Sequence, residues 1–293
     1  MAKTSESTVG RPVRRRSVRC ATARGLHRMS YLEWGDPANP RVVVCVHGLT
    51  RSAHDFDYLA AAICDDFRVI CPDVAGRGES AWLPDPMAYS VPTYAGDMVT
   101  LLARLDVESV QWLGTSMGGL IGLALAALPD SPIERLLLND VGAVVDAAGL
   151  DRIGSHVGAA PTFATLDEAE QYVRRVSATF GRHTDREWRF LTEHVVRLQE
   201  DGTYRMRYDP AIAVAVNAER PHKSVDLWNL YDLVRCPTLV VRGELSDLLS
   251  RETAQAMTQR GPRARVIEFA GVGHAPTLIH ADQIAAVRDF LVT

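Results

Sequence analysis

The sequence lacks the features that would place it in several broad classes of protein. No apolar run in its 293 residues approaches the roughly 18–20 residues of a membrane-spanning helix, and the longest, 120–128, ends at Pro129. Its five cysteines are an odd number with no CxxC pair, which argues against a disulfide scaffold and against a zinc site. A hydrophobic fraction of 47% excludes intrinsic disorder for most of the chain. We therefore expect a globular protein in the reducing cytoplasm, without a membrane span.

Lysine is nearly absent, and the positive charge is unevenly spread. The chain has only Lys3 and Lys223, and the net charge of −4 gives no general reason to expect nucleic-acid binding. Residues 1–28 nevertheless carry +7, whereas the remainder totals −11. The cluster Arg14–Arg16 is not followed by the apolar stretch that an export signal requires. We predict that residues 1–28 form a basic, flexible leader.

Short apolar runs alternate with stretches of helical periodicity along most of the chain. The runs are four to six residues long and mostly continuous, as in strands that are covered on both faces of a parallel sheet. The predicted strands are 42–46, 67–71, 110–113, 136–138, 238–241 and 266–269, and the predicted helices are 52–65, 93–105, 117–128 and 281–291. This order predicts an α/β fold with a doubly wound, mostly parallel sheet.

The alternation breaks between about residues 144 and 235. This stretch is rich in Ala, Arg and Glu, has helical periodicity and contains no convincing strand. It predicts a helical cap (144–235) inserted into a core formed by 29–143 and 236–293.

One glycine-rich turn carries the strongest chemical signal. Ser116 is the central residue of Gly114-Thr115-Ser116-Met117-Gly118, which follows a predicted strand and precedes a predicted helix. That context is typical of a nucleophile elbow, in which a sharp turn holds a serine hydroxyl above the sheet. Glycines at both ends of the motif remove side chains that would obstruct the turn. We expect Ser116 to be a nucleophile.

A serine hydroxyl needs a base, and a base needs an acid to orient it. His274 follows the last predicted strand in a glycine-rich loop, and we predict that it is the base. For the acid we favour Asp247, which enters the loop after the strand 238–241. Asp140, at the end of the preceding strand, and Glu244 remain alternatives.

The same chemistry needs N–H donors for an oxyanion. Met117, directly after the nucleophile, supplies one, and the loop 47–50 after the first buried strand supplies the other. We predict Leu49 for this second donor. His47 in the same loop is predicted to fix the loop by hydrogen bonds rather than to react.

Taken together, the order Ser116, Asp247, His274, the His47-Gly48 loop and the segment 73–80 (DVAGRGES) resemble the α/β-hydrolase superfamily from about residue 30 onward. The segments 47–50, 138–142 and 273–276 resemble a group of bacterial capped hydrolases. In that superfamily the acid often lies three residues after the glycine that ends its strand. Asp247 lies four after Gly243, and Ser246 holds the usual place.

The resemblance implies acyl transfer to Ser116 without a metal or an organic cofactor. We expect hydrolysis of small or medium carboxylic esters or lactones. Alternatives are a C–C bond hydrolase of β-diketone-like substrates, a lyase or acyltransferase, and a ligand-binding receptor on the same fold. Aromatic side chains are candidates to line the substrate pocket: Trp82, Trp188, Tyr208, Trp228 and Tyr231.

Overall fold

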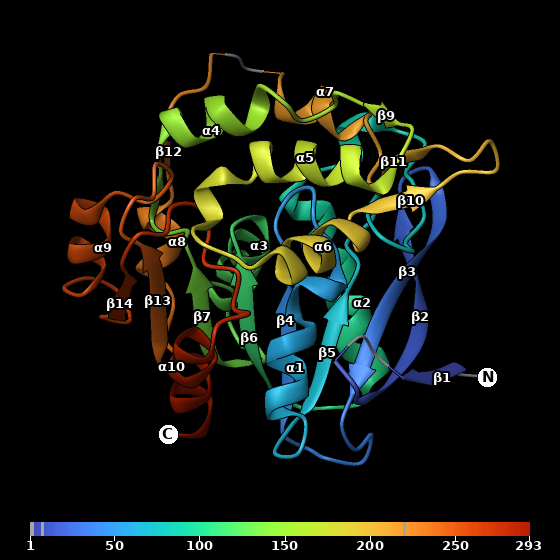
Figure 1. Cartoon of the computed structure of the whole chain (residues 1–293). Helices are drawn as coiled ribbons and strands as arrows, with labels where there is room; N and C mark the ends of the chain where they lie inside the picture. Colours follow the sequence, from blue (N-terminus) through green and yellow to red (C-terminus); the bar gives the residue numbers. More distant parts are fainter. Residues whose placement is uncertain (1–2, 7–8, 219–220) are drawn as a thin grey trace.

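A twisted, mostly parallel sheet forms the centre of the molecule (Figure 1). The structure is a computed structural model that describes residues 3–6, 9–218 and 221–293. Within them the strand order of the large sheet is β1-β2-β3-β5-β4-β6-β7-β13-β14. Its strands are β1 (Lys3–Glu6), β2 (Pro12–Thr22), β3 (Gly25–Trp34), β4 (Val42–Val46), β5 (Arg68–Pro72), β6 (Val110–Thr115), β7 (Ile133–Asn139), β13 (Thr238–Gly243) and β14 (Arg265–Phe269).

Helices cover both faces of this sheet, as a doubly wound fold requires. They are α1 (Asp57–Ile63), α2 (Val91–Leu105), α3 (Met117–Ala126), α9 (Arg251–Met257) and α10 (Ala281–Val292), with short 3-10 helices η1 (Ala53–Phe56) and η2 (Pro86–Ala88). All six predicted strands and all four predicted helices are present within a few residues of the expected bounds. The short helix α9 is an addition to the prediction.

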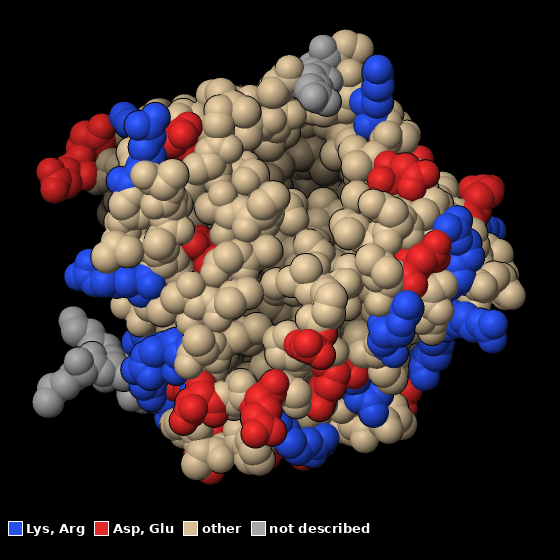
Figure 2. All heavy atoms as spheres, turned by 180° about the vertical axis from the view of Figure 1, so that it is seen from behind, with Lys and Arg blue, Asp and Glu red and all other residues tan. Residues whose placement is uncertain are grey.

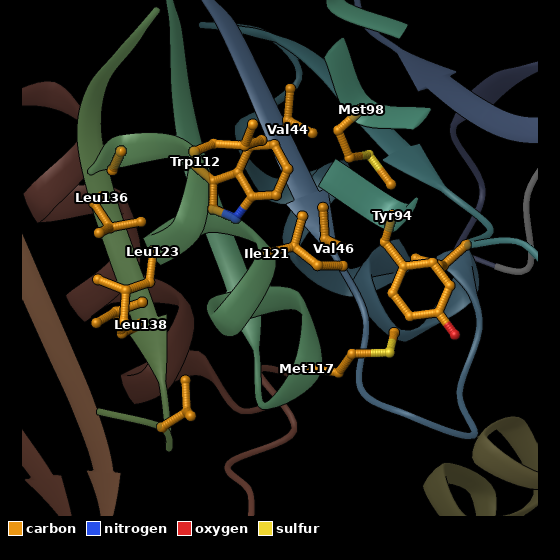
Figure 3. Packing of buried hydrophobic residues seen from close by; sticks show 14 of the residues in the cluster. Val44, Val46, Tyr94, Met98, Trp112, Met117, Ile121, Leu123, Leu136 and Leu138 are labelled. Atoms are coloured by element: carbon orange, nitrogen blue, oxygen red, sulfur yellow. The ribbon is translucent and has the colours of Figure 1, made fainter. Parts of the chain in front are cut away.

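Successive side chains of a strand point to opposite faces of the sheet, which explains how one sheet contributes to two hydrophobic cores. In β4, Val44 packs with Met98 of α2 and Ile121 of α3 on one face. Its neighbour Val43 packs with Leu59 of α1 on the other. Figure 3 shows part of the first core, in which Trp112 lies between strands and α3.

The prediction of a flexible leader is wrong for residues 3–6 and 9–28, which include β1 and β2, and residues 1–2 and 7–8 of that segment lie outside the described residues. β2 pairs with β3 in an antiparallel hairpin that extends the sheet. The alternation of the strand turns Arg14 and Arg16 to one face, where both bind the fully buried carboxylate of Glu33. The basic cluster therefore lies in a strand and forms ion pairs with residues of other elements.

The chain leaves the sheet after β7 and returns to it at β13, and the described residues of 144–218 and 221–235 lie mostly above the strand ends in Figure 1. We call them the inserted segment. Its elements are β8 (Val144–Val145), α4 (Ala147–Gly154), β9 (Thr162–Phe163), α5 (Leu166–Val176), η3 (Ala178–Phe180), α6 (Asp185–Glu193), β10 (Val196–Leu198), β11 (Tyr204–Met206), α7 (Ile212–Val216), β12 (Val225–Asp226) and α8 (Trp228–Tyr231). The expectation of no strand is wrong, because β10-β11-β9 form a small sheet and β12 pairs with β8.

None of the helices built from the described residues has both the length and the apolar character needed to cross a bilayer.

Candidate active site

The turn between β6 and α3 holds Ser116 in a backbone conformation that is rare for a residue with a side chain. Its φ is 51° and its ψ is −115°. A Cβ on Gly118 would lie 2.0 Å from the carbonyl oxygen of Val46, and one on Gly114 would lie 2.2 Å from the backbone of Gly118. Both glycines are thus required for the turn to pass so close to β4. The turn leaves Ser116 at the carboxyl edge of the sheet, as the motif predicts.

His274 reaches Ser116 from the loop that follows β14. Its Nε2 lies 3.0 Å from Ser116 Oγ, and both residues are buried. The hydroxyl of Thr179, from the inserted segment, donates to the backbone carbonyl of His274. The two residues that the sequence singled out as nucleophile and base are therefore within hydrogen-bond distance, although they lie 158 positions apart in the sequence.

The carboxylate beside His274 belongs to Asp140. Its Oδ2 lies 2.7 Å from His274 Nδ1, and the residue has no exposed surface. Two further donors fix this carboxylate, since Gly243 N–H donates to Oδ1 at 2.8 Å and Ser246 Oγ donates to Oδ2 at 2.6 Å. Ser116, His274 and Asp140 form one continuous hydrogen-bonded chain.

The prediction of Asp247 as the orienting acid is wrong. Asp247 binds Arg152 of α4 through two hydrogen bonds, of 2.6 and 2.8 Å, and does not bond to His274. Burial alone would raise the pKa of Asp247, but the hydrogen bonds and charge of Arg152, with the charge of His274, outweigh it and lower the pKa. The physical reason is the turn after β13, where Ser246 points at Asp140 and the next residue points away. Glu244, the other alternative, is exposed and accepts the N–H of Gly271.

Comparison with known proteins matches residues 41–281 to the alpha/beta hydrolase fold family. The chain belongs to the alpha/beta hydrolase family. It is 50% identical over 280 residues to a 3-hydroxybutyrate-oligomer hydrolase of Cupriavidus necator, covering 93% of this chain and 96% of that protein.

Solved structures agree with this assignment. A putative hydrolase from Rickettsia typhi superposes with a TM-score of 0.88 at 33% identity, covering 96% of this chain and 98% of that one. An alpha/beta hydrolase from Novosphingobium aromaticivorans superposes with a TM-score of 0.85 at 35% identity, covering 95% of this chain and 98% of that one. The chain is a hydrolase of this fold.

In this alpha/beta hydrolase, both residues predicted to bind an oxyanion lie beside Ser116. Met117 is the first residue of α3, where an N–H has no acceptor within the helix. Leu49 lies in the wall of the pocket that contains Ser116. Donation from these two N–H groups to an oxyanion stays a prediction.

Arg77, which the sequence reasoning did not single out, ties these two positions together. Its guanidinium is fully buried and donates to the carbonyl of Leu49 at 2.7 Å, while its Nη2 lies 3.4 Å from Met117 Sδ. Tyr94 accepts a further bond from it at 2.8 Å. Figure 3 shows the Met117 side chain extending from the start of α3 toward Tyr94. Arg77 lies in the segment 73–80, which contributed to the family resemblance above without its arginine being considered by itself.

His47 has the structural role that the sequence predicted. Its Nδ1 donates to the carbonyl of Gly48 at 2.7 Å, and its Nε2 accepts the N–H of Val74 at 3.0 Å. Burial lowers the pKa of His47, which favours the neutral ring that this pair of bonds needs. The ring therefore joins the loop after β4 to the loop after β5.

A pocket opens over Ser116 and His274, between the core and the inserted segment. Its cavity volume is about 100 Å³. Seen from behind, the molecule is hollowed near its top, on the side of the inserted segment, and few charged side chains surround the hollow (Figure 2). The inserted segment supplies much of the wall of the pocket, including Ile153, Tyr172, Val176, Phe180, Leu191, Met206 and Tyr208.

Of the five aromatic candidates, Tyr208 lines this pocket and the other four do not. Trp82 is largely exposed beside a second hollow. Trp188 packs in the interior of the inserted segment, because its helix α6 turns that face inward. Trp228 stacks under the guanidinium of Arg260 at 4.0 Å, and Tyr231 is buried with its hydroxyl on Met257 O. Periodicity located these rings on helices without showing which face meets the cavity.

Two side-chain clusters among the described residues have the composition of metal ligands: Cys20, His27 and Asp97, and His54, Asp57 and His194. In the first, His27 Nε2 bonds to Asp97 at 2.8 Å. In the second, His54 contacts Asp57 at 2.9 Å and the guanidinium of Arg15 at 3.0 Å. The positive charge of this guanidinium would repel a metal cation bound beside it. Neither cluster lines the pocket of Ser116. The expectation that the reaction uses no metal or cofactor stays a prediction.

Proposed function

We propose that the protein is a serine hydrolase that cleaves carboxylic esters through an acyl-enzyme on Ser116. The observation that carries this proposal is the hydrogen-bonded chain from Ser116 Oγ through His274 to Asp140. Such a chain lets imidazole accept the seryl proton while the carboxylate holds the ring and stabilises its charged form.

The reaction follows from these positions. His274 Nε2 takes the proton of Ser116 as Oγ attacks the ester carbonyl, and the N–H groups of Leu49 and Met117 stabilise the oxyanion. His274 then returns the proton to the leaving alkoxide, which departs as an alcohol. Water attacks the acyl-enzyme by the same steps, releasing the acid and restoring Ser116. Asp140 stays ionised throughout.

For the substrate we propose short esters of hydroxy acids, including 3-hydroxybutyrate oligomers, with small lactones as a related class. The support is the relative from Cupriavidus necator, named for hydrolysis of such oligomers and half identical to this chain. The mainly apolar pocket wall suits the methyl and methylene groups of these esters.

The experiment compares wild type with Ser116→Ala on p-nitrophenyl esters from acetate to octanoate and on the linear dimer and trimer of 3-hydroxybutyrate. We expect kcat of the variant to fall by roughly 10³-fold or more, the scale for removal of a triad member. Equal slow rates for both proteins on every substrate would contradict the proposal.

We also propose that the enzyme works in the cytoplasm, because all five cysteines are free thiols. Immunoblots of fractionated cells test this, and recovery with the periplasmic fraction would contradict it.

A further inference from the structure

Two guanidinium groups line the pocket that holds Ser116, one from the core and one from the inserted segment. Arg51 binds Asp55 through Nε at 3.0 Å and Nη2 at 2.7 Å. Arg152 binds Asp247 through the same two nitrogens. Each arginine thus has one edge fixed by a carboxylate. Among the described residues, no acceptor lies on Nη1 of Arg51.

Arg51 lines the same pocket as Ser116 and is poorly exposed to solvent. A Cβ on Gly48 would be 3.8 Å from both Arg51 Cγ and Ser116 Cβ, so the stem of Arg51 and the nucleophile flank the same glycine. Its side chain is 11% exposed, against 30% for that of Arg152. A hydrogen bond from Arg51 to a ligand is therefore less weakened by water.

The guanidinium of Arg51 is connected to His274 through two consecutive residues of the inserted segment. It lies 5.6 Å from the centre of the Phe180 ring. Phe180 adjoins Thr179, whose hydroxyl donates to the carbonyl of His274. Thr179, Phe180, His274 and Arg51 all line the same pocket. The leaving alkoxide receives its proton from His274, so the alcohol half of an ester must occupy the part of the pocket next to His274.

We propose that Arg51, oriented by Asp55, binds a carboxylate carried by the alcohol half of the substrate. In an ester of a β-hydroxy acid with a free acid end, that carboxylate is only three bonds from the leaving oxygen. It therefore falls on the His274 side of the pocket, where Nη1 of Arg51 can donate to it. The substrate class that this names is the linear hydroxy-acid oligomer with a free carboxyl terminus, and the inference rests on the proposed function above.

Asp55 has a specific part in this arrangement. Its contacts with Nε and Nη2 hold the planar guanidinium in one orientation, and its charge balances that of Arg51 when the pocket holds no anion. A charge-assisted bond from a fixed, poorly solvated donor is short and strong. A methyl ester of the same oligomer offers only a carbonyl oxygen there and loses that assistance.

The test measures kcat and KM on two substrates, the linear dimer of 3-hydroxybutyrate as free acid and the methyl ester of that dimer. The proteins are wild type, Arg51→Gln, Arg51→Lys and the matched control Arg152→Gln. We expect Arg51→Gln to raise KM for the free acid by about 10–50-fold, and for the methyl ester by about 3-fold or less. Arg51→Lys keeps the positive charge but loses the planar pair of donors, so its KM for the free acid should fall between those of wild type and Arg51→Gln. Arg152→Gln should change KM for both substrates by the same factor.

The outcomes separate this inference from the proposed function. Wild-type turnover of both dimers with an equal effect of Arg51→Gln on acid and ester would overturn the inference alone. A rise in KM that is confined to the free acid, found in Arg152→Gln and not in Arg51→Gln, would also overturn it, because the carboxylate would then bind the inserted segment. A wild type that cleaves neither dimer, nor any p-nitrophenyl ester, would overturn the proposed function and this inference with it.

Discussion

The loops after β7 and β13 begin at the same edge of the sheet, on adjacent strands, and each places an aspartate near His274. Asp140 comes directly after β7, is fully buried and receives donors from His274, Gly243 and Ser246. Asp247 comes four residues after the end of β13, is partly exposed and binds Arg152 of the inserted segment. One carboxylate is thus held by the core, and the other joins the core to α4.

The difference teaches that burial and donor count, rather than distance along the chain, decide which carboxylate can orient a histidine. Asp140 has its oxygens fixed by three donors from two other loops, so its negative charge has one position. Asp247 directs both oxygens at a single guanidinium, on the side of the inserted segment, and makes no hydrogen bond to the imidazole. Ser246 links the two loops, because its hydroxyl donates to Asp140 and accepts the N–H of Leu249.

The largest expected effect is that of Asp140→Asn. The amide presents a donor where His274 Nδ1 needs an acceptor, which favours the wrong tautomer of the ring. We expect kcat for p-nitrophenyl butyrate to fall by about 10³–10⁴-fold, with little change in KM. Steady-state kinetics measures it.

Asp247→Asn is the matched control, and its kcat should stay within about 3-fold of wild type, because its carboxylate does not contact the triad. The reverse pattern, with Asp247→Asn inactive and Asp140→Asn active, would restore the assignment made from the sequence.

A second prediction exchanges the two loops' roles. Ser246 Oγ lies 2.6 Å from the same Asp140 oxygen that contacts His274. A carboxylate at position 246 is therefore close enough to take over. We expect Asp140→Asn combined with Ser246→Asp to recover about 10–100-fold in kcat over Asp140→Asn alone, since restoring the acid recovers part of the triad's contribution.

The control for this rescue is Ser246→Asp in the wild-type background, where two carboxylates would share one site and repel each other. A double variant no faster than Asp140→Asn would mean that the loop after β13 cannot present an acid to His274.

Sequence reasoning reached the nucleophile and the base because each stands in a motif with a backbone requirement. The glycines around Ser116 and in the loop before His274 indicate places where the backbone passes so close to neighbouring atoms that few other residues fit. The acid has no such requirement. Asp140 and Asp247 both follow apolar strands, and only the side-chain directions after β7 and β13, which tertiary packing sets, distinguish them.

The sheet was predictable for a similar reason, and its antiparallel extension was not. Continuous apolar runs such as 42–46 indicate a strand buried on both faces. In β2, by contrast, Arg14 and Arg16 point toward a buried charge, and their partner Glu33 lies in another strand. A charged run whose counterions are distant in sequence looks the same as a solvated tail. The inserted segment hid its short strands in the same way, since β9–β11 have only two or three residues each.

The smallest expected effect tests the other half of the comparison, the link from Asp247 to Arg152. The pKa of Asp247 is lowered in the folded protein, so its ion pair stabilises the fold above its ordinary pKa of about 3.9 and the stabilisation is lost as pH falls through the lower, folded value. We expect Asp247→Asn to lower Tm by about 2 °C or less at pH 7, because a partly exposed pair contributes little. The difference from wild type should shrink as pH falls below the ordinary pKa of an aspartate, and should vanish once the wild-type carboxyl is also neutral. Scanning calorimetry or fluorimetry at a series of pH values measures this. A difference that persists unchanged in acid would mean that the substitution destabilises the protein through packing, and that the link between the core and α4 does not depend on charge.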